Sequence, residues 1–583
     1  MFSHIIVRHD MNRMTDSGAV SPGNRSEHAR MMIYQVLPRL FSNMQDRNIP
    51  SGSLEQNGCG KMNGFSDEVL ERIRAFGFTH IWYTGLIEHA TQTDYSQYGI
   101  QSDHPAVVKG KAGSPYAIKD YYDIDPDLAV DVPRRMKEFE ALVRRTHKAG
   151  LKFIMDFVPN HVARQYHSDA RPSRVKDLGE TDDPSVAFSP GNNFYYVLGQ
   201  PLHTGFDSQK SANTPYKEYP AKATGNDRFD AWPGVNDWYE TVKLNYGVDY
   251  VGGRTAHFDP LPDTWKKMTD ILLFWAKKGV DAFRCDMAEM VPCEFWAYAI
   301  SRVKEKYPAV RFIAEVYNPG QYRDYIRRGG FDYLYDKVGL YDTLRAVVCH
   351  QAPASSITGC WQSTDDIRQH MLNFLENHDE QRIASDFFVG SARKALPALV
   401  VSACMDTNPL MIYAGQELGE RGMDSEGFSG CDGRTTIFDY WSVESLRKIR
   451  AGEMYFTPDE RELYAYYNKV VSLCNGSAAL REGAFYDLMY ANYDRQGGFN
   501  PDRAYTFLRK AGDETLLIVA NFDDVPVHAG IRIPQHAFDF LSLRSGTYAS
   551  IDLISGETQT LELKPDAHVL VSVRPCDAVI LRL

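Results

Sequence analysis

VDAFRCDM, at residues 280–287, and RFIAEVY, at residues 311–317, are short apolar runs that each carry an acidic residue near the end. A longer amphipathic stretch separates them. Six similar runs lie elsewhere in the chain: MIYQVLPRL from Met32, HIWYTG from His80, KFIMDFV from Lys152, DYLYDKV from Asp332, MLNFLEN from Met371 and PLMIYAG from Pro409. Apolar strands that alternate with helical stretches are typical of a parallel sheet covered on both faces. Eight of them predict an α/β fold, a closed (β/α)8 TIM barrel.

The regions around these strands predict three further segments. Residues 1–30 are polar and aperiodic, and we interpret them as a flexible leader before a catalytic barrel over 31–499. The third and fourth strands are separated by more than a hundred residues, which predicts an inserted subdomain over 162–269, built above the barrel mouth. Short alternating runs such as TLLIVANF and DAVILRL predict a C-terminal antiparallel β-sandwich over 500–583.

The composition argues against several partners. Of the 583 residues, 43% are hydrophobic, and the formal net charge is −12, which repels nucleic acid but not a neutral sugar polymer. Nine cysteines occur without a CxxC pair, and no signal peptide is evident. The longest apolar run, ALPALVVSACM from Ala395, is too short to span a bilayer. We expect a cytoplasmic protein with no nucleic-acid or membrane partner, and the oligomeric state stays open.

Acidic and basic side chains gather where the predicted strands end. In chain order these residues are Asp156, Asn160, His161, Arg284, Asp286, Glu315, His378 and Asp379. A single acidic residue at a strand end is usually a helix cap or a surface charge, and we interpret Asp281 and Asp332 in that way. Caps and surface charges explain less well why several consecutive barrel strands end in an acidic residue, because all of these ends converge on one mouth of the barrel.

Several carboxylates beside an arginine suit one reaction well. Glycoside hydrolysis with retention needs a carboxylate nucleophile and a carboxylic acid about 5–5.5 Å apart. Crowded carboxylates raise the pKa of the acid, and an arginine keeps the nucleophile ionised. The strand ends therefore predict a retaining glycosidase.

Four segments resemble the conserved regions of the alpha-amylase superfamily of glycoside hydrolases. They are DFVPNH from Asp156, GVDAFRCDM from Gly279, FIAEVY from Phe312 and FLENHD from Phe374. SPYAIKDY from Ser114 is similar to the family's aromatic segment before strand three, and PLMIYAGQELG from Pro409 resembles its eighth-strand signature. The resemblance extends from Met32 to the C-terminus, and the ordered set is far more specific than any one motif.

The resemblance implies a role for each matching residue. Asp286 is the expected nucleophile and Glu315 the expected general acid and base. Asp379 is expected to hold the sugar's hydroxyls and to favour its distorted ring. The implied substrate-binding residues are Tyr116, which offers a ring for stacking, His161 and His378, which donate hydrogen bonds to the sugar, and Arg284, which orients the nucleophile.

The sequence departs from calcium-dependent relatives after the expected nucleophile. Glu289 and Met290 stand where typical calcium-dependent alpha-amylases supply a Lys-His pair, and RCDMAEMVPCEFW resembles the cyclomaltodextrinase and neopullulanase branch. Asn160 keeps one oxygen ligand, whereas calcium takes about 6–8. We therefore predict no cofactor and no metal ligand, with calcium left open because its usual site is incomplete.

The favoured function is hydrolysis of α-1,4 bonds in malto-oligosaccharides or starch-like glucans. A transglycosylase on the same scaffold is the nearest alternative, because it differs only in whether sugar or water attacks the intermediate. A catalytically inactive sugar-binding protein and a metal-dependent barrel enzyme are less favoured. The first would lose carboxylates that this chain keeps, and the second would group its ligands around one ion.

Overall fold

A computed structural model describes residues 29–205 and 215–583 of the chain. The predicted flexible leader therefore lies outside the described residues, apart from its last two positions. No helix in the described ranges is long and apolar enough to cross a membrane.

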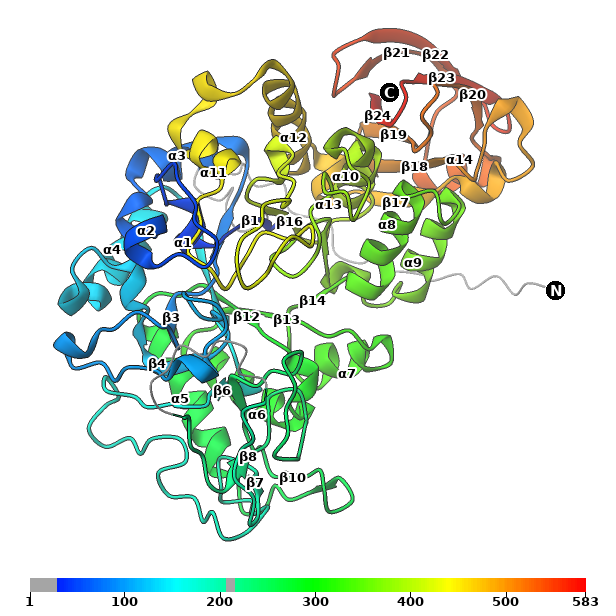
Figure 1. Cartoon of the computed structure of the whole chain (residues 1–583). Coiled ribbons are helices and arrows are strands. Elements are labelled where there is room, and N and C mark those ends of the chain that lie inside the picture. The colour runs from blue at the N-terminus through cyan, green and yellow to red at the C-terminus, as the bar shows by residue number, and fades with distance from the viewer. Residues whose placement is uncertain (1–28, 206–214) are drawn as a thin grey trace.

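Eight parallel strands close into a barrel, which confirms the predicted fold (Figure 1). They are β1 (Met32–Val36), β2 (His80–Tyr83), β5 (Lys152–Phe157), β12 (Ala282–Cys285), β13 (Arg311–Ala314), β14 (Tyr333–Tyr335), β15 (Met371–Phe374) and β16 (Leu410–Tyr413). Each run quoted from the sequence contributes one of these strands. The barrel closes where β1 pairs with both β2 and β16.

The two faces of each barrel strand enter different apolar clusters. Inward side chains fill the barrel interior, among them Ile33, Ile154, Ala282, Ile313 and Leu372. The alternate, outward side chains pack under the helices in the main core. Because successive side chains of a strand point to opposite faces, both faces of these strands have to be apolar.

Helices connect the barrel strands and cover their outer face. The longer ones are α3 (Asp67–Phe76), α4 (Arg135–Lys148), α5 (Asp263–Lys277), α6 (Cys293–Lys306), α10 (Leu396–Cys404) and α12 (Pro458–Gly476). Shorter helices α7 (Tyr322–Arg327), α8 (Asp342–Val348) and α9 (Ile357–Ser363) follow β13 and β14. In α3 the buried residues fall at helical spacing, Ser66 caps the N-terminus, and Gly77 ends the helix in the left-handed conformation.

The long connection after β5 forms the inserted subdomain. It contains β6 (His161–Ala163), β7 (Tyr196–Val197), β8 (Ala221–Lys222), β9 (Thr241–Lys243), β10 (Val248–Asp249) and β11 (Thr255–Ala256). The antiparallel pairing of β6 with β9 ties the end of the insertion to the loop that leaves the barrel. Helix α5 starts at Asp263, so the predicted range 162–269 overlaps its first turns.

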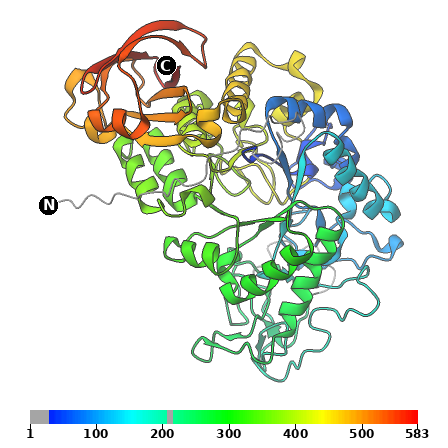
Figure 2. The ribbon, with the colours of Figure 1, turned by 180° about the vertical axis from the view of Figure 1, so that it is seen from behind.

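The C-terminal region is an antiparallel domain of two sheets. One sheet has the order β17-β18-β19-β24-β21-β22, and β20 pairs with β23 in the other. The strands are β17 (Ala484–Asp487), β18 (Ala504–Ala511), β19 (Glu514–Asn521), β20 (Val527–Arg532), β21 (Gly546–Asp552), β22 (Thr558–Leu563), β23 (His568–Val573) and β24 (Asp577–Arg582). The sheet thus begins before residue 500. Figure 2 shows this domain and the insertion at opposite ends of the molecule.

Candidate active site

The barrel register places the acidic side chains at one end of the strands. Arg284 is aligned with Asp156 on β5 and with Ile313 on β13. The backbone ladder continues past β12 and β13, because Asp286 N donates to Phe157 O at 2.9 Å and Glu315 N donates to Cys285 O at 3.1 Å. Arg284, Asp286 and Glu315 share the inward face with Ala282 and Ile313, since alternate residues point the same way.

Arg284 lies at the centre of this site and is fully buried. Its Nη1 donates to Asp286 Oδ1 at 2.7 Å, and its Nη2 forms an ion pair with Glu315 Oε2 at 2.8 Å. Asp156 Oδ1 lies 3.6 Å from Nη1, and Nε donates to Tyr335 Oη at 3.2 Å. One guanidinium therefore brings the two expected reacting carboxylates together, from neighbouring strands.

Glu315 is held by groups that approach both of its oxygens. The backbone N–H of Met287 donates to Oε2 at 2.8 Å, and the hydroxyl of Tyr317 donates to Oε1. Met287 is in the left-handed backbone region, with φ of 43°, a conformation that non-glycine residues adopt at a cost. This strained turn directs the Met287 N–H toward Glu315, so the chain just after Asp286 helps to position the second carboxylate.

The predicted sugar-binding residues lie beside these carboxylates. His378 Nε2 lies 2.5 Å from Tyr116 Oη and 3.1 Å from Asp379 Oδ2. The other ring nitrogen of His378 lies 2.8 Å from Gln35 Nε2. The Tyr116 ring stacks on His378, and the Arg284 guanidinium lies 5.5 Å from the centre of the Tyr116 ring. The partly exposed Asp379 thus joins the same cluster as Asp286 and Glu315.

His161 is buried at the start of the insertion, on β6. Its Nδ1 lies 3.2 Å from Asn160 Nδ2, and its ring packs against the half-buried Trp238 with centroids 5.2 Å apart. Burial and the cation of Lys243 lower the pKa of His161 to about 3. Burial and Arg284 lower the pKa of His378 as well. Both imidazoles are therefore neutral at neutral pH and suit an uncharged ligand.

Burial raises the pKa of several carboxyl groups in the cluster. Burial raises the pKa of Asp286; the nearby Arg284 opposes this rise, while Glu315 and Asp379 add to it. Burial also raises the pKa of Asp156 to about 6. Like charges confined in a buried site disfavour full ionisation, so Asp286 and Asp156 take up a proton at a higher pH than isolated carboxyls do.

Comparison with known proteins assigns this arrangement to a family. The model of the alpha-amylase catalytic domain matches residues 35–316, which include Asp286 and Glu315. The chain contains an alpha-amylase catalytic domain. The chain is accordingly a glycoside hydrolase, and the predicted resemblance to the alpha-amylase superfamily is confirmed.

Named members of the superfamily match the chain along most of its length. Alpha-amylase 3 of Dictyoglomus thermophilum is 22% identical over 563 residues, which cover 93% of this chain and 94% of that protein. A cyclomaltodextrinase of a Bacillus species is 22% identical and covers 84% of this chain and 72% of that protein. The maltogenic alpha-amylase AmyB of Thermotoga neapolitana has the same fold, with a TM-score of 0.62, 18% identity and coverage of 95% and 98%.

The site also contains residues that sequence reasoning did not select. Tyr317 donates to Glu315, Tyr335 accepts from Arg284, and Arg434 Nε donates to the backbone oxygen of Asp379 at 2.6 Å. Tyr317 and Tyr335 stand in the quoted strand segments, where an aromatic residue indicates packing as readily as function. Arg434 lies in a loop that carries no motif, so no pattern in the sequence indicated it.

The superfamily's calcium site can be tested against the residues around Asn160. Its Oδ1 accepts a hydrogen bond from the buried Lys243 Nζ at 2.6 Å, and the same ammonium forms an ion pair with Asp227 at 2.5 Å. A cation of the protein itself thus occupies the oxygen that calcium would need. Glu289 is also engaged, because its Oε2 accepts the backbone N–H groups of Tyr317 and Asn318 at 2.9 Å. These residues do not fit a calcium ion.

One other acidic group in the described chain has metal-like spacing. Glu88, Asp123 and Asp169 bring carboxylate oxygens within 4.8 Å of one another. Arg135 lies among them, with Nη2 at 2.6 Å from Asp123, 3.9 Å from Glu88 and 4.0 Å from Asp169. The arginine already supplies the positive charge there, so we assign no metal to this group.

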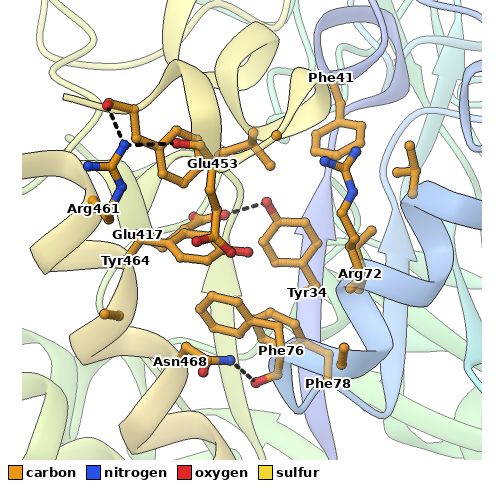
Figure 3. Close-up of a pocket in the computed structure, with 17 residues that line it drawn as sticks. Tyr34, Phe41, Arg72, Phe76, Phe78, Glu417, Glu453, Arg461, Tyr464 and Asn468 are labelled. Atoms are coloured by element: carbon orange, nitrogen blue, oxygen red, sulfur yellow. Dashed lines mark hydrogen bonds between the residues drawn. The ribbon is translucent and has the colours of Figure 1, made fainter. Parts of the chain in front are cut away.

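A cavity of about 460 Å³ lies outside the barrel, apart from the carboxylate cluster (Figure 3). Its walls come from the outer face of β1, from α3 and from α12, and include Tyr34, Phe76 and Tyr464. The hydroxyl of Tyr34 donates to the buried Glu417 at 2.5 Å. None of the predicted site residues lines this cavity, so we place the chemistry at the barrel mouth.

Proposed function

We propose that the chain hydrolyses α-1,4-glucosidic bonds in malto-oligosaccharides or starch-like α-glucans with retention of configuration. The observation that carries the proposal is the Arg284 guanidinium, which contacts Asp286 at 2.7 Å and Glu315 at 2.8 Å. Retaining glycosidases need one carboxylate that attacks and one carboxylic acid that protonates. The superfamily assignment supports this pairing, and the sugar-binding set around His378 supports a neutral substrate.

In the first step, an ionised Asp286 attacks the anomeric carbon. The bond from that carbon to the glycosidic oxygen breaks, and the leaving oxygen takes a proton from Glu315. A glycosyl-enzyme ester on Asp286 and a free sugar hydroxyl result. Arg284 stabilises Asp286 as the anion before attack, and Asp379 and His378 bind the hydroxyls of the distorted ring.

In the second step, Glu315 is ionised and acts as a base. It removes a proton from water, the water oxygen attacks the anomeric carbon from the face opposite Asp286, and the ester bond to Asp286 breaks. Two displacements restore the original anomer. Burial and the neighbouring Glu315 and Asp379 raise the pKa of Asp286, and the Arg284 cation opposes this rise and so favours the ionised Asp286 that the first step needs.

The nearest alternative is an α-glucan transglycosylase, in which a sugar hydroxyl replaces water in the second step. The relatives carry the names alpha-amylase and cyclomaltodextrinase, and these support hydrolysis. The oxygen and hydroxyl groups of the site can assist attack by water or by a sugar hydroxyl, so they do not distinguish the two reactions. An inactive sugar-binding protein is less favoured, because Asp286, Glu315 and Asp379 are all retained.

A product time course tests this function. The chain is incubated with maltoheptaose, pullulan and cyclodextrin side by side, with Asp286→Asn as the inactive control. We expect shorter malto-oligosaccharides to appear from maltoheptaose first. Products longer than the substrate would favour the transglycosylase, and no turnover of any α-glucan would overturn the proposal. We also propose a cytoplasmic location, which nine unpaired cysteines support.

A further inference from the structure

The C-terminal domain exposes a group of aromatic side chains on one side. Tyr490 exposes 54% of its surface and Phe540 exposes 59%, and His536 is exposed beside them. Phe540 and His536 lie on α14 (Gln535–Leu541), a short helix that packs against β17 (Figure 1). Tyr490 lies in the turn that follows β17. Single exposed aromatic residues are common and need no explanation, but contiguous ones indicate a contact surface.

A buried tyrosine organises these rings into one unit. Tyr486, on β17, is only 7% exposed. Its hydroxyl lies 2.6 Å from the Tyr490 hydroxyl and 2.7 Å from His536 Nδ1. Its ring centroid lies 5.6 Å from that of His536 and 5.7 Å from that of Phe540. We call these four residues, Tyr486, Tyr490, His536 and Phe540, the aromatic platform.

The hydrogen bonds give the platform a defined shape before any ligand binds. Tyr490 and His536 are both tied to the same hydroxyl, and His536 stacks on Phe540 with an interplanar angle of 20°. Side chains that are already ordered lose less entropy on binding. The platform therefore differs from a loose apolar patch, whose rings would each have to be immobilised by a partner.

The chemistry of the platform fits a neutral ligand with apolar faces and polar edges. Aromatic rings bind flat apolar surfaces, while phenol and imidazole groups offer hydrogen bonds at the rim. Pyranose rings present C–H faces surrounded by hydroxyls. Phe540, Tyr486 and Tyr490 bring no formal charge, and a neutral polymer is not repelled by a chain of net charge −12.

We propose that the aromatic platform is a second binding site for α-glucan chains, outside the barrel mouth. The inference rests on the proposed function in its choice of ligand, because the polymer that the barrel cleaves is the sugar available to the rest of the chain. A second contact on the same polymer raises the local concentration of substrate bonds near the enzyme. The platform then affects long glucans and leaves short oligosaccharides, which cannot reach both sites, unaffected.

The test uses the full chain with Asp286→Asn, which removes turnover, in native gels that contain soluble starch. Tyr490→Ala and Phe540→Ala are added to this background, singly and together. Two control variants remove side chains of similar exposure elsewhere: Leu570→Ala on β23, 75% exposed, and Tyr455→Ala on the barrel, 57% exposed. Melting temperatures verify that each variant is folded.

We expect the double platform variant to bind starch about tenfold more weakly than the Asp286→Asn background, which equals about 1.4 kcal/mol. The controls should bind as the background does. With Asp286 restored, the platform variants should keep kcat/KM for maltotriose and lose activity on starch. Equal retardation of platform and control variants would overturn the proposal.

Self-association of the chain and failure of the proposed function each give a distinct result. If the platform variants sediment as a smaller species than the parent chain, the rings are a self-association surface and the glucan site is refuted. If the unmodified chain cleaves maltotriose and the platform variants bind starch normally, only the second site fails. If the unmodified chain neither cleaves maltotriose nor binds starch, the proposed function itself fails.

Discussion

The Arg284 guanidinium donates to Asp286 at 2.7 Å, from two residues earlier on the same strand end. Its second terminal nitrogen reaches Glu315 at 2.8 Å. A lysine at this position carries one compact charge and cannot contact both carboxylates with the same geometry. We therefore expect Arg284→Lys to lower kcat/KM on maltotriose by about 10²-fold or more.

The control for Arg284→Lys is Arg323→Lys, whose side chain is exposed and pairs with Asp366. The control should retain the activity of the parent chain. If Arg284→Lys also retains it, the guanidinium does not organise the reacting carboxylates.

Lys243 provides a direct test of the calcium prediction. Because its ammonium occupies the Asn160 oxygen, we expect chelator treatment to leave the melting temperature and the activity unchanged. Lys243→Met should instead destabilise the chain by about 3 kcal/mol, since it leaves Asp227 without its buried partner. Thermal unfolding with and without chelator measures both effects.

Lys176→Met in the insertion is the matched control, because Lys176 is exposed and its ion pair with Glu180 contributes little. A large drop in melting temperature with chelator, reversed by added calcium, would contradict the assignment and indicate a metal site elsewhere in the chain.

The insertion aromatics separate into groups that mutation can distinguish. Tyr195 is buried and Tyr196 donates to Asp182, so Tyr195→Ala and Tyr196→Ala should lower the melting temperature. Trp232 is 58% exposed, and Trp232→Ala should change neither stability nor preference. Trp238 packs on His161, one of the predicted sugar-binding residues, and Trp238→Ala should shift the preferred oligosaccharide length.

Rates on maltotriose, maltopentaose and maltoheptaose measure that shift, with Trp232→Ala as the matched tryptophan control. If Trp238→Ala only lowers the melting temperature and keeps the order of preference, the insertion is a structural cover at this position.

A buried acid outside the site predicts a dependence of stability on pH. Burial raises the pKa of Glu417 from 4.5 to about 7 in the folded chain. The folded state therefore holds this proton more tightly than the unfolded state. The resulting stabilisation is complete below about pH 4.5 and is lost as the pH rises to about 7.

Glu417→Gln removes this titration while it keeps an oxygen that can accept from Tyr34. Relative to the parent, the variant should gain about 1–3 kcal/mol of stability between pH 5 and pH 8. Urea unfolding at both pH values measures the difference. A constant difference between variant and parent at the two pH values would show that Glu417 does not titrate in this range.

The strands and the cluster at the barrel mouth could be predicted from sequence because both depend on local patterns. Each barrel strand is apolar on both faces, and the acidic residue stands where the run ends, as in Asp286 and Glu315. The order of the motifs along the chain then predicts which of these side chains lie close together. The roles of these residues remain predictions, although the structure brings their side chains together.

The remaining features depend on contacts between distant parts of the chain. Lys243 meets Asn160 only because β9 pairs with β6. The hydroxyl of Tyr317 contacts Glu315 because of the conformation of the tyrosine side chain, which the periodicity of the sequence does not predict. The C-terminal sheet starts early because the short strand β17 (Ala484–Asp487) pairs with β18, although four residues alone give a weak strand signal.

The most direct test of the proposed mechanism identifies the residue that attacks the sugar. The chain is treated with a fluorinated glucosyl fluoride, whose good leaving group allows the glycosyl-enzyme to form while the ring fluorine slows its hydrolysis. The modified protein is digested after lysine and arginine, which releases the segment from Cys285 to Arg302, and fragment masses locate the sugar. We predict a single glucosyl group on Asp286. A glucosyl group on another residue, or full turnover of glucan by Asp286→Asn, would contradict the central claim.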